Sequence, residues 1–319
     1  MKKTQHPLSP TAKTASILNI VNTEGFFDYR LLDCGGGRKL EQFGSILINR
    51  PELQALWSKT LSDAEWNKAH AIFAPSSDED ERGRWRIDRP IPDDWRISVN
   101  LSSAGFKKDI KISMYCKLQG LWHIGIFPEQ YPHWVWMLDQ LQNIKDEQPR
   151  VLNLFGYTGA ASIIAAAVGA DVTHLDASKK TLAWAKENQR ASSLEQATIR
   201  WMLDDAKKFV ARELRRGKTY HFILIDPPKF GRGPNGEVWD LFRDLPEFLI
   251  QCKGLLCDQK SAFILTVYAI RASVLSFDQL VREVMRKNGG IFDSGELALL
   301  SESGKALPTS LFTRWTSFV

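Results

Sequence analysis

The sequence predicts an α/β protein in which a smaller β-rich domain precedes a doubly wound, mainly parallel sheet that ends in an antiparallel hairpin. Three observations lead to this prediction. From residue 150 onward, short apolar segments typical of buried strands alternate with longer segments typical of helices, which is the pattern of a parallel sheet covered on both faces. Between residues 26 and 127, apolar and polar residues alternate with the period of two of half-buried antiparallel strands. A short turn joins the last two expected strands. We place the domain boundary at residue 125, between a β-rich domain (1–125) and an α/β domain (126–319).

The composition is that of an ordinary globular protein and excludes several classes of protein. Of the 319 residues, 44% are hydrophobic and 25% charged, and no apolar run approaches the roughly 20 residues that span a membrane. No apolar segment follows the lysines at the start, so we expect no signal peptide and a cytoplasmic location. The four cysteines lack the spacing of metal ligands, so we expect them to be reduced and predict no metal site. A net charge of +5 is compatible with a nucleic-acid partner without requiring one.

Five strands are expected in the β-rich domain. Two of them, over residues 29–33 and 44–48, flank the glycines 35–37, which we interpret as a hairpin turn. The other three segments that alternate with period two are 95–99, 109–115 and 121–126. The tryptophans of this region would stack on bases in a nucleic-acid-binding protein. A small β domain also needs large apolar side chains to fill its core, so we expect most of them to be buried.

The α/β domain contains a regular series of elements. An apolar helix over residues 134–144 leads into it. The expected strands are 151–155, 171–175, 198–203, 221–225 and 262–267. The expected helices are 160–168, 180–191, 206–215, 241–255 and 277–287. The terminal hairpin is expected from strands 296–300 and 311–318, which a turn over 303–308 connects.

The first strand of the α/β domain leads into a loop of small residues, Gly156-Tyr157-Thr158-Gly159-Ala160. We expect Gly156 and Gly159 to take backbone angles closed to other residues, so that the chain turns sharply and a ligand can approach the main chain. Asp176 ends the second strand about 20 residues further on, where an acidic side chain accepts hydrogen bonds from two ribose hydroxyls. This pattern indicates a site for a nucleoside-type ligand. A buried glycine turn without a ligand and a nicotinamide site remain alternatives on these residues alone.

Two further acidic signals follow strands of the same sheet. Asp204-Asp205 comes after the third strand, and one of these carboxylates would accept a hydrogen bond from an adenine amino group. Asp226-Pro227-Pro228 comes after the fourth, where two prolines fix a rigid, extended turn. The carboxyl ends of parallel strands meet at one edge of the sheet, which is where such sheets bind ligands. Four signals at one edge therefore favour a binding site over a plain strand exit.

These residues carry a resemblance to a known family. The α/β domain resembles the class I S-adenosylmethionine-dependent methyltransferases, whose Rossmann-like sheet ends in an antiparallel strand. Over residues 125–319 it is similar to the large-subunit ribosomal RNA methyltransferases of the cytosine-5 type. The family motifs N-x-F-x-Y-T-G and D-P-P-K-F stand here as Asn153-Leu154-Phe155-Gly156-Tyr157-Thr158-Gly159 and Asp226-Pro227-Pro228-Lys229-Phe230. Further matches are the segment Gly125 to Gln130, Asp176-Ala177-Ser178 with Asn188, and Asp204-Asp205.

The resemblance implies an enzyme that binds S-adenosyl-L-methionine and methylates a base of RNA, with ribosomal RNA favoured. It implies that Asp176 binds the ribose, that Asp205 binds the adenine, and that the glycine loop covers the methionine end of the cofactor. The residues that it places in the cofactor site are Gln130, Asn153, Phe155, Gly156, Tyr157, Thr158, Gly159, Asp176, Ala177, Ser178, Asn188, Asp204, Asp205 and Asp226. The residues that it places against the methyl group and the acceptor, as the catalytic set, are Asp226, Pro227, Pro228 and Lys229. Neither the residues nor the resemblance predicts an oligomeric state.

One departure from the family bears on the chemistry. Relatives that methylate carbon 5 of cytosine place a cysteine just past the fifth strand, because that carbon must first be activated by a thiolate. The corresponding segment here, Thr266 to Arg271, contains no cysteine. A ring or exocyclic nitrogen can attack without such a thiolate. The alternative functions are methylation of a small molecule or a protein, non-catalytic RNA binding on this fold, and a nucleotide-dependent oxidoreductase. The last would need a G-x-G-x-x-G loop after the first strand, and the loop there, Gly156-Tyr157-Thr158-Gly159-Ala160, does not have this pattern.

Overall fold

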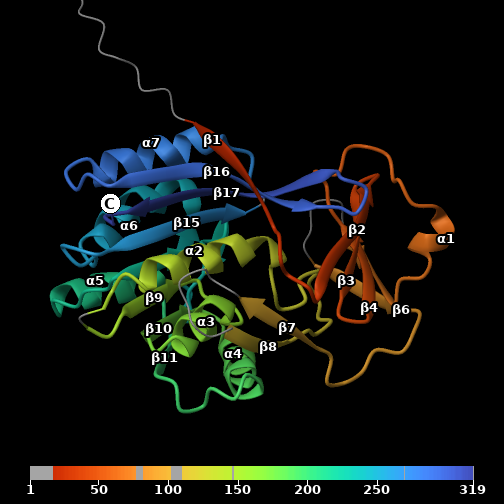
Figure 1. The fold of residues 1–319 in the computed structure, drawn as a ribbon, viewed down its shortest axis with the longest axis horizontal. Helices are drawn as coiled ribbons and strands as arrows, with labels where there is room; N and C mark the ends of the chain where they lie inside the picture. Colours follow the sequence, from red (N-terminus) through yellow and green to blue (C-terminus); the bar gives the residue numbers. More distant parts are fainter. Residues whose placement is uncertain (1–16, 77–81, 102–109, 146, 269, 319) are drawn as a thin grey trace, which may run out of the picture.

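The computed structural model describes residues 17–76, 82–101, 110–145, 147–268 and 270–318. An eight-stranded sheet with helices on both faces stands beside a five-stranded sheet built by the amino-terminal half of the chain (Figure 1). Two expectations rest on residues outside the described ranges, namely the absence of a signal peptide and the start of a strand at Asp109. Within the described residues, no helix combines the length and the apolar character needed to cross a bilayer.

The large sheet confirms the predicted α/β fold class. Its strands lie in the order β1-β16-β17-β15-β12-β9-β10-β11. All neighbours are parallel except β17, which is antiparallel to both β15 and β16. The strands are β1 (Leu18–Asn22), β9 (Arg150–Leu154), β10 (Asp171–Asp176), β11 (Ile199–Leu203), β12 (Phe222–Ile225), β15 (Ala262–Tyr268), β16 (Ile291–Leu300) and β17 (Ala306–Thr316).

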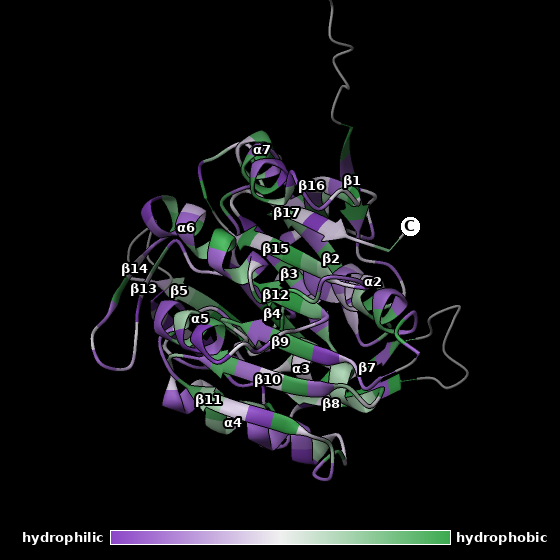
Figure 2. Ribbon diagram, turned by 90° about the vertical axis from the view of Figure 1, so that its left-hand side faces the viewer, coloured by the Kyte–Doolittle hydropathy of each residue, from purple (hydrophilic) through white to green (hydrophobic). Residues whose placement is uncertain are grey.

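Side chains of the central strands alternate between two apolar cores, one on each face of the sheet. In β12, Phe222 and Leu224 belong to the core that also contains side chains of helices α2 and α3, whereas Ile223 and Ile225 pack with side chains of α5, α6 and α7. Figure 2 shows the central strands β9 and β12 as largely hydrophobic. The helices are α2 (Tyr131–Leu141), α3 (Ala160–Ala167), α4 (Lys179–Ala191), α5 (Ala206–Arg215), α6 (Leu241–Lys253) and α7 (Val274–Met285).

The five-stranded sheet has the order β2-β3-β4-β5-β6, and three of its strands, β3, β5 and β6, were not predicted. Its strands are β2 (Tyr29–Gly35), β3 (Arg38–Phe43), β4 (Ile46–Pro51), β5 (Ala71–Pro75) and β6 (Gly83–Ile87), and a one-turn helix, α1 (Asp63–Trp66), lies between β4 and β5. The glycine turn joins β2 to β3, so the prediction that it leads to residues 44–48 was wrong. We missed β3 because it buries two charged side chains, Lys39 and Glu41. These side chains pair with Glu52 and Arg50, at 3.1 and 2.5 Å.

The predicted strand over residues 121–126 does not form. The backbone of this segment bonds to scattered partners instead of one neighbouring strand. The carbonyl of Trp122 accepts from Arg50 (3.2 Å), that of Ile124 from the Lys117 amide (3.0 Å), and that of Gly125 from the Thr158 hydroxyl. Gly125 has a φ of 111°, outside the range of a regular strand. A short 3-10 helix, η1 (Pro128–Gln130), follows and leads directly into α2.

Segments from before residue 125 contact the large sheet and its helices. Strand β1 pairs with β16 at the sheet edge, and the pair β7 (Arg96–Leu101) and β8 (Ile110–Tyr115) packs beside α3 and α4 (Figure 1). The hairpin β16–β17 reaches the five-stranded sheet, where Leu31 bridges to Ser301. The boundary at residue 125 remains a prediction, and the two halves share an extensive contact. A further two-stranded hairpin consists of β13 (Phe230–Arg232) and β14 (Val238–Asp240).

Candidate active site

The carboxyl ends of β9, β10, β11 and β12 bring the predicted site residues to one edge of the sheet. Hydrogen bonds between main-chain groups connect these strand ends. The Asp226 amide donates to the carbonyl of Leu154 (3.4 Å), and the Asp204 amide donates to that of Asp176 (3.3 Å). The residues after β9 form the glycine loop, so this loop and three acidic segments lie on adjacent strands, as predicted for a ligand-binding edge.

The glycine loop is strained, but not where we expected. Phe155 and Tyr157 have φ values of 58° and 51°, in the left-handed region that costs non-glycine residues energy. Gly159 has a φ of 88°, as predicted. Gly156 does not have a positive φ, so our reason for a glycine there was wrong. A Cβ atom at Gly156 would lie 2.4 Å from the His174 ring, so the glycine is required by close packing against β10.

Buried polar side chains hold the loop in this conformation. The Thr158 hydroxyl donates to the carbonyl of Gly125 in a short hydrogen bond. The Asn188 side chain donates to the Thr158 carbonyl (2.9 Å) and accepts from the Tyr115 amide (2.9 Å), so it connects the loop to β8. Asn153 donates to the Ser162 hydroxyl (2.9 Å) at the start of α3. Thr158 and Asn188 were both predicted as site residues. The hydrogen bonds described here for their side chains are all to other groups of the protein.

Asp176 is positioned by main-chain donors. One oxygen accepts from the Tyr157 amide (3.0 Å) and the other from the Ser178 amide (2.8 Å), while the Ser178 hydroxyl caps α4. Burial raises the pKa of Asp176 to about 6, and the two main-chain hydrogen bonds oppose that rise. The carboxyl is therefore mostly ionised at neutral pH. Each oxygen keeps a lone pair with which to accept a ligand hydroxyl. Ala177 lies between these residues and is partly exposed.

The two acidic residues after β11 have different surroundings. Asp204 accepts from the Asp205 amide (2.8 Å), and its other oxygen forms an ion pair with Arg212 (2.6 Å). Asp205 is buried and caps α5 by accepting from the Lys208 amide (3.0 Å). Because Arg212 neutralises Asp204, Asp205 is the carboxylate of the two that has no cationic partner in the described part of the chain.

A cavity of about 530 Å³, which we call the carboxyl-edge cavity, opens at this edge. Seven of the predicted residues line it: Gln130, Asn153, Phe155, Gly156, Tyr157, Thr158 and Asp226. The other predicted cofactor residues, Gly159, Asp176, Ala177, Ser178, Asn188, Asp204 and Asp205, are not among the lining residues, and neither are Pro227, Pro228 and Lys229. Two apolar side chains that were not among the predicted site residues, Phe127 and Trp134, also line it. Both lie in or beside the helical segment that precedes β9, where nothing in the pattern distinguishes a lining side chain from a core one.

Among the described residues that line the carboxyl-edge cavity, Asp226 is the one with a charged side chain, and it has no cationic partner. Its carboxylate accepts one hydrogen bond, from the Gln130 amide nitrogen (3.1 Å), and no Lys, Arg or His of the described chain lies within ion-pair distance. Burial, together with the nearby carboxyl of Glu129, raises the pKa of Asp226 to about 7. An unpaired carboxylate beside a cavity fits a ligand that carries positive charge.

The rest of the Asp-Pro-Pro-Lys segment leads from the interior to the surface. Pro227 is buried, whereas Pro228 and Lys229 are exposed. The Pro228 carbonyl accepts from the Trp239 indole (2.8 Å), which fixes the turn against β14. The Lys229 ammonium lies over the Phe230 ring, 5.1 Å from its centroid, and forms no ion pair within the described residues. Lys229 is therefore free to contact a ligand outside the cavity.

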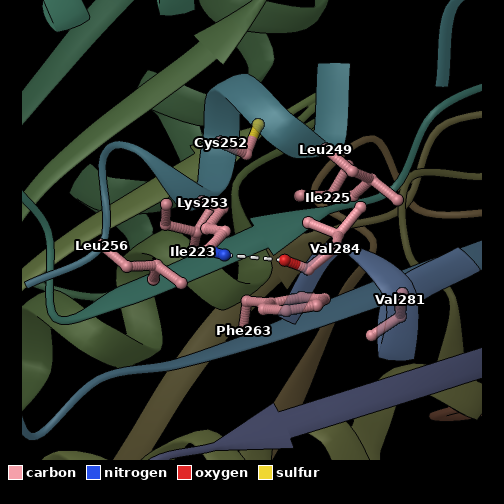
Figure 3. A pocket seen from close by; sticks show the side chains of 9 residues that line it. All are labelled: Ile223, Ile225, Leu249, Cys252, Lys253, Leu256, Phe263, Val281 and Val284. Carbon is pink, nitrogen blue, oxygen red and sulfur yellow. Dashed lines mark hydrogen bonds between the residues drawn. The ribbon is translucent and has the colours of Figure 1, made fainter. Parts of the chain in front are cut away.

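A second cavity, of about 260 Å³, has a different character (Figure 3). It lies between α6, α7 and the strands β12 and β15, and its walls are almost entirely apolar. Its one charged residue, Lys253, donates to the carbonyl of Val284 (2.8 Å), as Figure 3 shows. Because no polar group converges on it, this cavity is a packing gap in the core and offers no chemistry.

Replacing Asp226 by Asn tests the environment of this carboxyl. Its pKa in the folded protein, about 7, exceeds its ordinary value of 3.8, so the native state holds more protons between these values and loses stability as the pH rises. We expect Asp226→Asn to become more stable relative to the wild type, by roughly 2 kcal/mol, from about pH 5 to about pH 8. Urea unfolding of both proteins measures this difference. If the difference in unfolding free energy between the two proteins did not change with pH, the Asp226 carboxyl would not be shielded from water.

Comparison with known proteins agrees with this geometry. Residues 133–281 match a family described as S-adenosylmethionine-dependent methyltransferase. Among curated proteins, the chain is similar to ribosomal RNA large subunit methyltransferase K/L of Shewanella frigidimarina (38% identity over 107 residues, 33% of this chain) and of Alteromonas mediterranea (33% over 145 residues, 42% of this chain). The matched parts span only 15% and 20% of those proteins.

Among solved structures, that of SMU.776 complexed with SAH shares the fold, with a TM-score of 0.66 and 19% identity over 91% of this chain and 75% of that one. The crystal structure of the SAM-dependent methyltransferase from Agrobacterium tumefaciens is much more similar. It has a TM-score of 0.85 and 45% identity, over 95% of this chain and 94% of that one. A likeness of this extent, together with the glycine loop and the acidic edge, shows that the chain belongs to the S-adenosylmethionine-dependent methyltransferases.

Proposed function

We propose that this enzyme methylates a nitrogen of an RNA base, in ribosomal RNA and in the cytoplasm. The observation that carries the proposal is the Asp226-Pro227-Pro228-Lys229 segment, which has an unpaired carboxylate at the cavity and an exposed lysine three residues further along the chain. An exposed cation close in sequence to the site suits a phosphate backbone, and the net charge of +5 is compatible with RNA. The names of the curated relatives support the same substrate class.

The proposed cofactor roles are those that the family resemblance implies, and the position of the residues at one sheet edge supports them. S-adenosyl-L-methionine supplies an electrophilic methyl group on a positively charged sulfur. In the proposed site, Asp226 complements this charge, and Phe155, Gly156, Tyr157 and Gly159 enclose the methionine end. Asp176 accepts from the ribose and Asp205 from the adenine. Thr158, Asn153 and Asn188 act through the hydrogen bonds that shape the loop.

The choice of a nitrogen rests on the cysteines. All four are described, and none lines the carboxyl-edge cavity. Cys252 is buried in α6, and Cys257 lies beside Arg150 at the opposite end of the strands. The segment over residues 266–271, where the related cytosine-5 enzymes have their thiol, contains no cysteine. Attack by a nitrogen lone pair needs no covalent activation, only alignment with the methyl group and exclusion of water.

The glycine loop gives a direct test of the proposed cofactor site. In Gly156→Ala the new methyl group would lie 2.4 Å from the His174 ring, so the loop must move. We expect the dissociation constant for S-adenosylmethionine to rise about tenfold or more, which corresponds to about 1.4 kcal/mol. Isothermal titration calorimetry measures it. The control is Gly120→Ala, where no atom lies within 4 Å of the added carbon. Equal affinity in both variants would place the cofactor elsewhere.

The substrate is tested by nucleoside mass spectrometry of ribosomal RNA from a strain that lacks the gene. We expect one methylated base to disappear and to return when the wild-type gene is restored. The base should not return with Asp226→Ala, because this change removes the carboxylate that complements the cationic cofactor. An unchanged nucleoside profile would reject ribosomal RNA as the substrate and favour a small molecule or a protein.

A further inference from the structure

The hairpin of β13 and β14 follows the Asp-Pro-Pro segment and has two faces of different character. Two of its register pairs are Gly231 with Trp239 and Arg232 with Val238. Side chains alternate along a strand, and residues directly opposite each other share a face. Trp239 and Gly231 therefore form one face, which we call the inner face. The other face consists of Phe230, Arg232 and Val238, and we call it the outer face.

The inner face fixes the hairpin beside the proposed cofactor site. The Trp239 ring is buried and packs on Phe155, which lines the carboxyl-edge cavity, with ring centroids 5.1 Å apart. Its indole donates to the Pro228 carbonyl (2.8 Å). The main chain at Gly233 comes so near to Asp205 that a Cβ atom added there would lie 3.1 Å from the Asp205 Cβ atom. The hairpin therefore extends along the sheet edge from the end of β9 to the end of β11.

The cations of α5 that contact this hairpin already have anionic partners. Lys208 pairs with Glu237 (2.6 Å) in the turn of the hairpin. Lys207 pairs with Asp244 of α6 (2.9 Å) and also donates to the Val238 carbonyl (3.0 Å). Strand β14 contacts α6 as well (Figure 2). These contacts hold the hairpin in place and leave little positive charge on that side of it.

The outer face, in contrast, combines an exposed aromatic ring with uncompensated positive charge. Phe230 is 62% exposed and Val238 is 50% exposed. Arg232 is exposed too, and neither Arg232 nor Lys229 forms an ion pair within the described part of the chain. Because the Lys229 ammonium lies over the Phe230 ring, positive charge and aromatic surface are adjacent here.

This combination is complementary to single-stranded RNA. An unpaired base has a flat surface that stacks on an aromatic ring, and the phosphates beside it attract lysine and arginine. The core of a protein–protein interface, in contrast, is depleted of charged residues and rests on a contiguous apolar patch. On the outer face the apolar side chains are Phe230 and Val238, and two unpaired cations accompany them. RNA therefore fits this face better than a protein does.

We propose that the outer face of the hairpin binds the RNA strand next to the methylated base, with Phe230 stacked on a neighbouring base and with Lys229 and Arg232 at its phosphates. This inference rests on the proposed function. The base to be methylated must reach the methyl group near Asp226. Phe230 does not line the carboxyl-edge cavity and lies on the face of the hairpin opposite Trp239. Its ring therefore serves a neighbour of the target base and not the target itself.

The first test measures the affinity for a fluorescein-labelled single-stranded RNA of random sequence and about 12 nucleotides, a length that such surfaces cover. Fluorescence anisotropy should show that Phe230→Ala binds this RNA about fivefold more weakly than the wild type, or weaker still, because a stacked base is lost. Phe230→Tyr keeps the ring and should bind within about twofold of the wild type. The matched control is Phe27→Ala, at a position 82% exposed before β2, which should bind as the wild type does.

The dependence of binding on salt separates the charge from the ring. Arg232→Gln removes one cation at a phosphate, so the slope of log affinity against log salt concentration should become shallower by about 0.7. Phe230→Ala should leave this slope unchanged, because it removes no charge. The matched control is Arg215→Gln, at an exposed position where α5 ends and leads toward the start of β12, at the opposite edge of the sheet. It should change neither the affinity nor the slope.

The inference would be overturned by a wild type that binds no RNA, or by an unchanged slope in Arg232→Gln. Equal RNA binding by the wild type and Phe230→Ala, which a surface for a protein partner predicts, would also overturn it. So would a loss of affinity for S-adenosylmethionine in Phe230→Ala as large as the loss for RNA, because the hairpin would then serve the cofactor. Failure of the proposed function looks different. If the expected RNA binding were seen but the ribosomal RNA of the deletion strain kept all its methylated bases, the proposed substrate would be rejected and the outer face would still be an RNA-binding surface.

Discussion

The Asp226 carboxyl lies at the edge of the sheet without a cationic partner in the described residues, and the function of the site depends on this arrangement. Burial and the nearby carboxyl of Glu129 both raise its pKa. A lysine beside this carboxyl would stabilise its charge, but the described part of the chain places none within ion-pair distance. The charge is useful only when a ligand compensates it. A cationic methyl donor would do so.

The glycine loop shows how the rest of the structure serves this edge. Its unfavourable backbone angles at Phe155 and Tyr157 persist because surrounding groups determine them. Gly125 and Asn188 bond to Thr158, Asp176 bonds to the Tyr157 amide, and the His174 ring excludes a side chain at position 156. The segments on which these contacts depend come from before β9 and from β10 and α4. Groups from both halves of the chain therefore hold the strained loop in place. Close packing of β7 and β8 on the methyltransferase domain is part of this support.

The α/β half could be predicted from the sequence because its strands are short apolar runs separated by long helices. The glycine loop, Asp176 and Asp226 were recognisable because local spacing alone determines their place at a strand end. The β-rich half was harder to predict. Strand β3 was missed because Lys39 and Glu41 are charged yet buried, and only their partners on other segments make that burial tolerable. Residues 121–126 alternate in the sequence, but their burial does not alternate in the structure, where residues 124–126 are all buried.

The central claim, that the unpaired charge at this edge complements a cationic cofactor, is tested most directly by comparing two ligands that differ in that charge. Calorimetry of the wild type and Asp226→Asn with S-adenosylmethionine and with S-adenosylhomocysteine gives four affinities. The account predicts that the substitution weakens binding of the positively charged sulfonium compound roughly tenfold or more, but that of the neutral thioether much less. Equal losses for both ligands, or no loss for either, would contradict it.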